Sequence, residues 1–379
     1  MKRFWNWWLA GTLGALLAST VAMADELPKA TQEILQALNM QPAVLAGLDA
    51  ELKVPAGWIA GAQKEGKLRI SGSWDPPAFN QYVRPFQERY PFIKLEYGRG
   101  SFNTRSISLL VAFKQGRVVA DVLTGFGGSF LQFKDAGALA DISDIPNVAN
   151  VPQQMKDPGG LWAGHQMTHY CITYNTKLIK ADELPRTWDD LLTNAKLRNQ
   201  HLGVGDRPQL WLIALSGAKG EAWVDDFITK LFSEVKPQLR KEGLNANVSL
   251  AGAGEMMAAL PTSGYRTRFE AEKGAPVSFH CPEPVPGSTN EMAIMRNAPD
   301  NNAAHLFMNW ALSKEGQVSQ FNTDGGSPTH KAFQNDDRFI AYSETIAGKA
   351  VAFRTPELLA DNGPRVIEFW NASWAKMSR

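Results

Sequence analysis

Small polar and basic residues gather at three places where a predicted strand runs into a predicted helix. These junctions are Ser71–Trp74, Arg99–Thr104 and Gly125–Ser129. Ligands of open α/β sheets bind at the carboxyl ends of strands, where helix N-termini offer free N–H groups and a positive dipole end. The guanidinium groups of Arg99 and Arg105 would add charge-assisted contacts. The three junctions together predict an anion-binding site, although N-capping explains each one alone.

A second group of candidate residues lies later in the chain. Asp206 and Arg207 end a predicted strand just before Pro208, a typical helix start. The segment Ser263-Gly264-Tyr265-Arg266 follows a predicted short helix. Both groups are expected to project toward the first three junctions, and salt bridges at the surface are the alternative role for each.

Three catalytic or nucleotide-binding motifs are incomplete or absent. Gly125-Phe126-Gly127-Gly128 lacks both the Gly-Lys-Ser/Thr of a P-loop and the spacing of a dinucleotide site. No serine lies in a Gly-x-Ser-x-Gly nucleophile motif. His165 and His169 have the i, i+4 spacing of a zinc-binding helix, but Gln166 replaces the catalytic Glu and the segment is predicted to be extended. Structural histidines are therefore expected.

Composition narrows the class of protein. The 379 residues include 39 Lys+Arg and 38 Asp+Glu, so the chain lacks the basic footprint of a nucleic-acid-binding protein. This length predicts two domains. Residues 1–24 have the layout of a secretory signal peptide, with Lys2 and Arg3, an apolar stretch and the small-residue exit Ala22-Met23-Ala24. We expect cleavage after Ala24 and an exported, soluble protein; an uncleaved membrane anchor is the alternative.

The order of predicted elements favours an α/β architecture. Short helices are predicted in residues 25–66, and strands alternate with helices from Lys67 to Gly137. A long extended segment, 161–175, leads into a second α/β block, which includes a predicted short helix over 255–260 and strands over 262–266 and 277–280. This pattern predicts two lobes that face a cleft, divided as 1–24 signal peptide, 25–66 helical extension, 67–168 first lobe, 169–285 second lobe, and 286–379 return to the first lobe with C-terminal helices.

Several ordered motifs resemble the extracellular solute-binding proteins of ABC importers, in the branch commonly labelled iron(III)-type. The resemblance covers about residues 67–335, and the motifs are Trp74–Phe79, Tyr97–Arg105, Ala120–Gly128, Pro185–Leu191, Lys273–Val277 and Ala311–Gln317. It implies a two-lobed type II periplasmic-binding fold with a hinge of crossing strands and a central ligand cleft. It also implies a partner, the cognate ABC permease of the inner membrane.

The sequence departs from the ferric-ion binders of that branch, which typically place two adjacent tyrosines in the second lobe. Here Tyr265 is followed by Arg266, a cation that opposes Fe³⁺ but favours an anion. We therefore expect a small anionic organic solute, a carboxylate, phosphate or phosphonate, bound by residues of both lobes. The expected ligand-binding residues are Ser73, Trp74, Arg99, Ser101, Asn103, Thr104, Gly127, Gly128, Asp206, Arg207, Tyr265 and Arg266.

Two other functions stay open at this point. The first is ferric-ion binding by Tyr265, a carboxylate such as Asp75, and a histidine with a synergistic anion. The second is an exported hydrolase with a metal on His165 and His169. The leading hypothesis is a periplasmic, monomeric, non-enzymatic binding protein that needs no metal or cofactor and contacts no nucleic acid.

Cys171 and Cys281 are the two cysteines of the chain. An exported protein enters an oxidising compartment, where an even count permits one disulfide. Each cysteine lies in a predicted extended segment, and in a two-lobed fold these crossing segments run side by side. We expect a disulfide across the hinge; two buried, reduced cysteines are the alternative.

Overall fold

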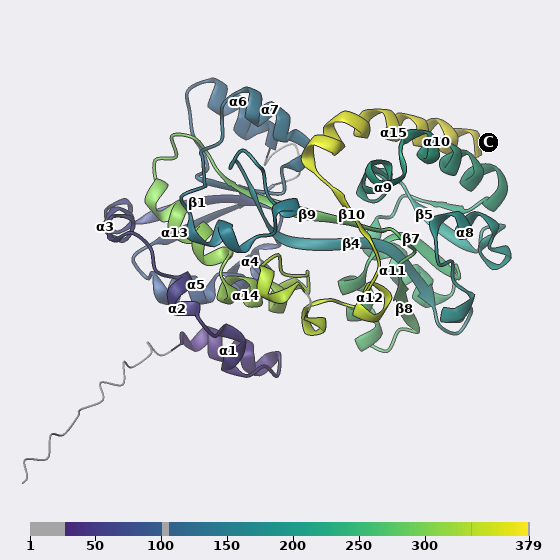
Figure 1. The fold of residues 1–379 in the computed structure, drawn as a ribbon, viewed down its shortest axis with the longest axis horizontal. Helices are drawn as coiled ribbons and strands as arrows, with labels where there is room; N and C mark the ends of the chain where they lie inside the picture. The colour runs from purple at the N-terminus through teal and green to yellow at the C-terminus, as the bar shows by residue number, and fades with distance from the viewer. Residues whose placement is uncertain (1–26, 101–105, 335, 378–379) are drawn as a thin grey trace, which may run out of the picture.

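The computed structural model describes residues 27–100, 106–334 and 336–377. In this part of the chain the strands form a single ten-stranded sheet that runs through two lobes (Figure 1), with the order β2-β1-β3-β9-β4-β7-β5-β6; β10 pairs with β9, and β8 pairs with β4. Helices cover the sheet in both lobes. The predicted two-lobed α/β architecture is confirmed.

The first lobe is built on three parallel strands. They are β1 (Lys67–Gly72), β2 (Lys94–Arg99) and β3 (Val122–Thr124). Alternate residues of β1 are buried, as expected for a strand with one face toward the core. The helices of this lobe are α4 (Pro76–Tyr82), α5 (Arg84–Arg89), α6 (Ser108–Lys114), α7 (Phe130–Asp135), α13 (Asn301–Ala311) and α14 (Lys314–Asp324).

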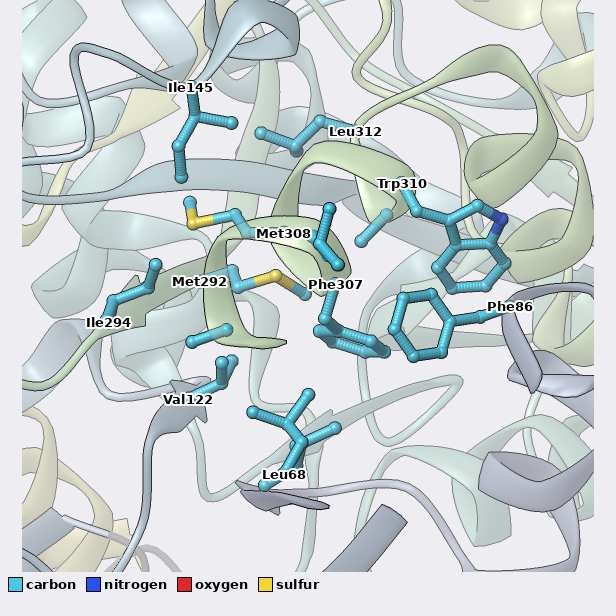
Figure 2. Close-up of a cluster of buried hydrophobic side chains, with 14 of the residues drawn as sticks. Leu68, Phe86, Val122, Ile145, Met292, Ile294, Phe307, Met308, Trp310 and Leu312 are labelled. Carbon is cyan, nitrogen blue, oxygen red and sulfur yellow. The ribbon is translucent and has the colours of Figure 1, made fainter. Parts of the chain in front are cut away.

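Helix α13 packs its apolar side chains on these strands. Figure 2 shows Phe307 and Met308 of α13 in one apolar cluster with Leu68 of β1 and Met292 of the returning strand β9. All four side chains are fully buried. Burial of each large apolar side chain contributes about 1.5–3 kcal/mol relative to leaving it exposed. The core thus joins the early strands to a segment more than 200 residues later.

Two long antiparallel strands carry the chain between the lobes. They are β4 (Ala163–Asn175) and β9 (Val285–Ile294). Strand β4 pairs with β9 through His169 and with β7 from Tyr170 onward, so its partner changes in mid-strand. The long extended segment predicted over 161–175 is confirmed. These crossing strands form the hinge region.

The second lobe contains strands and helices of the middle of the chain. They are β5 (Leu202–Gly205), β6 (Gln238–Arg240), β7 (Ala258–Ser263), β8 (Val277–His280), α8 (Trp188–Thr193), α9 (Leu212–Lys219), α10 (Glu221–Lys230), α11 (Leu244–Ala253) and α12 (Gly264–Glu272). The helix predicted over 255–260 is wrong, because its second half belongs to β7 and its first half is not helical. The strand predicted over 262–266 is also wrong beyond Ser263, where α12 begins. Strand β7 lies between β4 and β5 and is buried at all six positions, so it shows no alternation.

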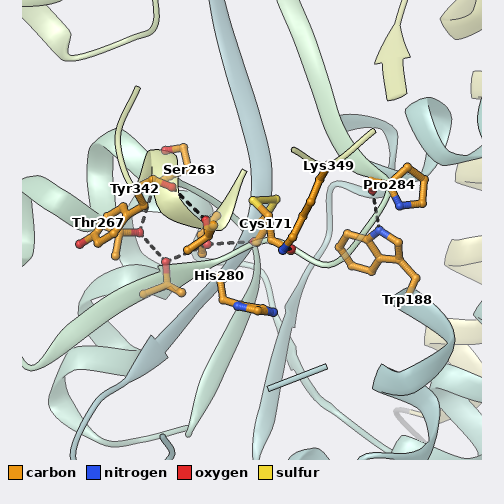
Figure 3. Close-up of a disulfide and its surroundings, with 12 residues drawn as sticks. Cys171, Trp188, Ser263, Thr267, His280, Pro284, Tyr342 and Lys349 are labelled. Atoms are coloured by element: carbon orange, nitrogen blue, oxygen red, sulfur yellow. Dashed lines mark hydrogen bonds between the residues drawn. A yellow bond between two sulfur atoms is a disulfide. The ribbon is translucent and has the colours of Figure 1, made fainter. Parts of the chain in front are cut away.

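The predicted disulfide between Cys171 and Cys281 is present, with an S–S distance of 2.10 Å and a Cα–Cα distance of 5.0 Å. Cys171 lies in β4, and Cys281 follows β8, which pairs with β4 beside it. Figure 3 shows the bond next to His280 and Lys349, whose Nζ donates to the Cys281 carbonyl at 2.6 Å. The disulfide therefore links the strand that leaves the first lobe to the segment that returns.

The N-terminal helices pack on the first lobe. They are α1 (Lys29–Ala37), α2 (Leu48–Glu51) and α3 (Ala56–Glu65), which confirms the short helices predicted before residue 66. Glu51 pairs with Lys314 at 3.0 Å, and the Glu65 carboxylate accepts from the backbone of Asn302 and Ala303 at the start of α13. The predicted signal peptide lies outside the described residues, and among those that are described no helix has the length and apolarity to cross a membrane.

The C-terminal helix contacts both lobes. After β10 (Val351–Arg354), α15 (Pro356–Met377) runs from α7 of the first lobe to α9 and α10 of the second (Figure 1). Trp370 is fully buried in the second-lobe core. The C-terminal part of α15 is thus packed in the second lobe, while its first turns face the first lobe.

Candidate ligand-binding site

A hollow of about 1030 Å³ lies between the two lobes. Sites for small organic ligands occupy about 300–1,000 Å³, so this cleft accommodates such a ligand. Its walls come from strand ends, helix starts and the crossing strands of both lobes. The polar side chains that line it are Ser73, Asp75, Gln132, Gln166, Thr168, Tyr170, Arg207, Gln209, Asn245, Tyr265, Ser288, Thr289, Asn290, Glu291, Asp324 and Arg354.

The floor of the cleft is formed by the crossing strands. Gln166, Thr168 and Tyr170 of β4 line it, and they alternate along the strand. Successive side chains of a strand point to opposite faces, so these three share one face. Residues 288–291 of the partner strand β9 complete the floor. The hinge strands therefore supply ligand-facing groups as well as the connection between lobes.

The first-lobe wall comes from two of the predicted junctions. Ser73 and Trp74 follow β1, and Gly127 and Gly128 follow β3; all four line the cleft. Trp74 is only 6% exposed, with its ring centroid 5.3 Å from that of Tyr82. The indole is thus held rigidly by the core while one edge reaches the cleft.

Arg99 lies away from the cleft wall, at the end of β2. Its Nη1 atom is 2.8 Å from Oδ1 of Asp75, and it lines a separate hollow beside β1 and β2. The guanidinium therefore already has an anionic partner. The other predicted residues of this junction, Ser101, Asn103 and Thr104, lie outside the described residues.

The second-lobe wall includes two of the four residues predicted for it. Arg207, which follows β5, and Tyr265, in the first turn of α12, line the cleft. Asp206 is not part of the lining; its carboxylate is 4.0 Å from the Arg207 guanidinium. Arg266 is turned to its own helix, where its Nη2 atom is 2.5 Å from Oε1 of Glu270. Of the two arginines predicted for this wall, Arg207 lines the cleft and Arg266 does not.

Tyr265 stays a neutral phenol at ordinary pH. Burial is the largest effect on it and raises its pKa to about 12, with a smaller contribution from nearby Tyr170. A neutral phenol donates a hydrogen bond to an anion or accepts one from a donor. Tyr170 lines the same cleft, so two phenols are available there.

Glu291 is a cleft residue that the sequence analysis missed. It is 3% exposed, and its Oε2 atom accepts a hydrogen bond of 3.1 Å from the Gly127 amide. Burial raises the pKa of this carboxyl, while the Arg354 charge and the Gly127 bond act against the rise. A single acid in a strand has no motif or spacing that would mark it in advance.

Asp324 is a second missed acid, at the C-terminal end of α14. Its Oδ1 accepts from Gln166 Nε2 at 2.9 Å and from the Gly326 amide at 3.0 Å, and its Oδ2 accepts from Gln320 Nε2 at 2.8 Å. Burial nevertheless raises its pKa. These hydrogen bonds fix the carboxyl at the edge of the floor.

Arg354 and α15 complete the cleft, and neither was predicted. Arg354 ends β10, and its Nη1 donates to the Gln209 carbonyl of the second lobe at 3.3 Å. Leu359, Ala360 and Pro364 of α15 line the cleft as well. Pro364 has no N–H, so the Ala360 carbonyl lacks its usual helical donor. The first half of α15 therefore adds a mostly apolar wall.

The two histidines of the metal-hydrolase alternative do not form a metal site together. Both lie in β4, so four residues separate them by about 13 Å, too far to share one ion. Each is buried, and this lowers the pKa of His165 to about 3 and that of His169 to about 4. In the described part of the chain no group of three or more His, Cys, Asp or Glu side chains is arranged to hold a metal. These histidines belong to the packed hinge.

Two lobes, a hinge of crossing strands and a polar cleft between them define a solute-binding protein of the two-lobed periplasmic type. Residues 69–318 match the family described as bacterial extracellular solute-binding protein. The chain belongs to this family, which confirms the resemblance seen in its motifs.

Solved structures of such proteins share the fold at low sequence identity. Iron-bound HitA from Pseudomonas aeruginosa is 19% identical, with a TM-score of 0.67, over 81% of this chain and 99% of that one. AfuA from Actinobacillus pleuropneumoniae, with fructose-6-phosphate bound, is 20% identical, with a TM-score of 0.64, over 82% and 98%. Apo ferric ion-binding protein A from Pasteurella haemolytica is 13% identical, with a TM-score of 0.68, over 83% and 99%.

Proposed function

We propose that this protein is the periplasmic substrate-binding component of an ABC importer and that it captures a small organic solute with an anionic group. The solute binds between the lobes, and a hinge motion about β4 and β9 closes them around it. The loaded protein then delivers the solute to its permease in the inner membrane. No catalysis is assigned to the cleft.

The presence of two guanidinium groups in the cleft carries this proposal. Arg207 and Arg354 both line it, and guanidinium binds carboxylate, phosphate and phosphonate groups through charge-assisted, bidentate hydrogen bonds. The Arg207 side chain is 54% exposed, and its Nε atom is as far as 4.0 Å from Oδ1 of Asp206, so the guanidinium is accessible to a ligand. Ser73, Thr168 and Tyr265 supply hydroxyl groups nearby.

The cleft volume supports an organic solute. About 1030 Å³ is far more space than a single metal ion fills. The fructose-6-phosphate complex of AfuA shows that one structurally similar protein holds an organic phosphate. A solute of comparable size with an anionic group fits the proposed role here.

Ferric ion remains a second candidate substrate, because Tyr170 and Tyr265 line the same cleft. Two of the similar structures are described as iron-bound or ferric-ion-binding proteins. Phenolate binding to Fe³⁺ produces a visible charge-transfer colour. Addition of Fe³⁺ with citrate to the purified protein should leave it colourless if the organic solute is the substrate.

The direct test is to identify the solute that the protein retains. We expect mass spectrometry of gently purified protein, denatured to release its ligand, to find an organic anion at close to one equivalent. Calorimetry with that compound then measures its affinity for the emptied protein. Iron in place of an organic anion, together with a visible absorption band, would contradict the proposal.

A further inference from the structure

The charged groups of the cleft are divided between its two sides. Glu291 of β9 and Asp324 of α14 lie on the first-lobe side, beside Gly127 and Gln166. Arg207 follows β5 in the second lobe, and Arg354 donates to the backbone of that lobe. A ligand that spans the cleft therefore meets carboxyl groups on the first-lobe side and the Arg207 guanidinium on the second-lobe side. Arg354, on the strand beside β9, lies between them and acts on Glu291 through its charge.

A third acid of the lining, Asp75, does not alter this division. Its carboxylate is 2.8 Å from the Arg99 guanidinium, which compensates its charge. The remaining charged groups are two acids and two bases. The Arg354 charge acts on Glu291 without forming an ion pair, so a ligand with anionic groups alone would leave both acids without an ion-pair partner among the described residues.

Glu291 is a buried acid of the cleft that has no ion-pair partner among the described residues. It is 3% exposed, and its carboxylate accepts hydrogen bonds from neutral backbone amides, those of Gly127 and of Glu291 itself. Within the described residues no Lys, Arg or His nitrogen lies within 4.0 Å of its carboxylate. A buried carboxylate is costly unless a charge compensates it, and the protein offers none in contact.

We infer that the cleft takes a zwitterionic solute, whose ammonium group binds at Glu291 and whose anionic group binds at Arg207. The inference rests on the proposed function and adds a positively charged group to the anionic solute proposed there. An ammonium group supplies three donors and a positive charge, which together satisfy the carboxylate. Burial raises the pKa of the Glu291 carboxyl in the empty cleft because it disfavours the charged form, and an ammonium group in contact with the carboxylate would lower that pKa again.

The competing solute is an anion whose other groups are uncharged, such as a sugar phosphate. Its hydroxyl groups would donate to Glu291 and Asp324 but would bring no counter-charge. We favour the ammonium group because hydrogen bonds alone do not remove the cost of a buried charge. The two classes differ in one measurable property, the gain in affinity that a primary amine confers.

The experiment compares matched pairs of probes by calorimetry on ligand-free protein. The pairs are 3-aminopropylphosphonate with propylphosphonate, and 4-aminobutyrate with butyrate; glucose 6-phosphate represents the sugar phosphates. We expect at least one amino compound to bind 10-fold or more tightly than its amine-free partner. Glu291→Gln should reduce that ratio to about twofold or less while leaving affinity for the amine-free anion unchanged or improved.

Three controls separate the possible failures. Gln at position 291 still accepts from Gly127, and thermal melts establish that the variant folds; Asp324→Asn serves as a second test of the acidic pole. Glu344→Gln removes an exposed acid outside the cleft and should keep the wild-type ratio. Arg207→Gln should weaken both members of each pair.

Equal or tighter binding of the amine-free anions, or of glucose 6-phosphate, with no response to Glu291→Gln, would overturn the zwitterion and leave the proposed function intact. Failure of every probe in the series to bind would also overturn it. If the retained organic ligand bound the Arg207→Gln variant with unchanged affinity, that result would count against the proposed function itself.

Discussion

The Gly127 amide donates a 3.1 Å hydrogen bond to the carboxylate of Glu291, although the two residues are 164 positions apart in the chain. The bond joins the turn after β3 to strand β9. An anion of the ligand was expected at this turn, and a carboxylate of the protein lies there instead. The anionic group of a solute must therefore bind at another part of the cleft, and the guanidinium groups are the available partners.

The close contact at Gly127 predicts a structural cost for a larger residue. A Cβ atom added there would lie 2.4 Å from Oε1 of Glu291, so Gly127→Ala must displace a buried carboxyl. We expect a loss of about 1–3 kcal/mol in the free energy of unfolding, typical of overpacked sites. Gly57→Ala, in the exposed part of α3 with no atom within 4 Å, is the matched control and should be neutral or stabilising by up to about 1 kcal/mol. Denaturant titration measures both, and equal stabilities for the two variants would refute the predicted contact.

The two arginines of the candidate site should respond differently to truncation. Arg207 lines the cleft, whereas Arg99 pairs with Asp75 and faces another hollow. Loss of a charge-assisted hydrogen bond costs about 1.5–3 kcal/mol. We therefore expect Arg207→Gln to weaken binding of the retained solute by roughly 10- to 100-fold and Arg99→Gln to change it by less than about threefold. Calorimetry decides the assignment: the reverse order would place the counter-charge at Arg99.

Buried histidines make the fold sensitive to acid. Burial lowers the pKa of His165 to about 3 and that of His169 to about 4, both far below the ordinary value of 6.5. Below pH 6.5 the unfolded chain therefore binds more protons at these sites than the folded chain, and stability falls as the pH falls toward 4. The raised pKa values of Glu291 and Asp324 act in the opposite direction, so a variant is needed to isolate the histidines.

His165→Phe removes one of these groups and keeps a ring beside Trp74, whose centroid is 5.2 Å away. Between pH 6.5 and 4.5 the variant should lose roughly 2 kcal/mol less unfolding free energy than the wild type, since each pKa unit corresponds to about 1.4 kcal/mol. The exposed His201 provides the control, and His201→Gln should keep the wild-type profile. Parallel pH profiles for His165→Phe and the wild type would disprove the role of burial.

The sequence allowed the fold to be predicted better than the site. The order of strands and helices from Lys67 and the long extended run of β4 are local patterns, and both were correctly interpreted. Strand β7 was missed because burial on both faces removes alternation, the signal by which strands are recognised. Residues 301–324 form two helices rather than one, because the Ser313 hydroxyl accepts a hydrogen bond from the Gly316 amide and caps the second helix.

The missed site residues share a physical reason. Glu291, Asp324 and Arg354 come from three late elements that meet the early junctions only after the chain returns to the first lobe. Their separation in the sequence carries no spacing that chemistry requires. Arg99 and Arg266 were plausible by residue type, but their guanidinium groups have acidic partners nearby, which only the folded chain reveals.

The disulfide should contribute strongly to stability. Cys171 and Cys281 are fully buried and 110 residues apart, so the bond closes a long loop in the unfolded chain. The chain-entropy account gives about 4–5 kcal/mol for a loop of this length. We expect the double variant Cys171→Ala, Cys281→Ala to unfold at clearly lower denaturant concentration. Two reactive thiols in denatured, unreduced wild-type protein would show that the bond does not form.

Trp74 should report ligand binding by fluorescence. Its indole lines the cleft between Ser73 and Asp75, and it is fixed by Tyr97, whose hydroxyl donates to the Trp74 carbonyl at 2.8 Å. A solute that enters the cleft replaces water at the exposed edge of the ring, which changes the polarity around the indole. We expect a shift in emission on addition of the retained solute that disappears in Trp74→Phe. Trp223→Phe, which removes an indole stacked on Phe227 outside the cleft lining, should keep the shift. A shift that survives in Trp74→Phe but not in Trp223→Phe would mean that the solute acts on the second lobe away from this wall.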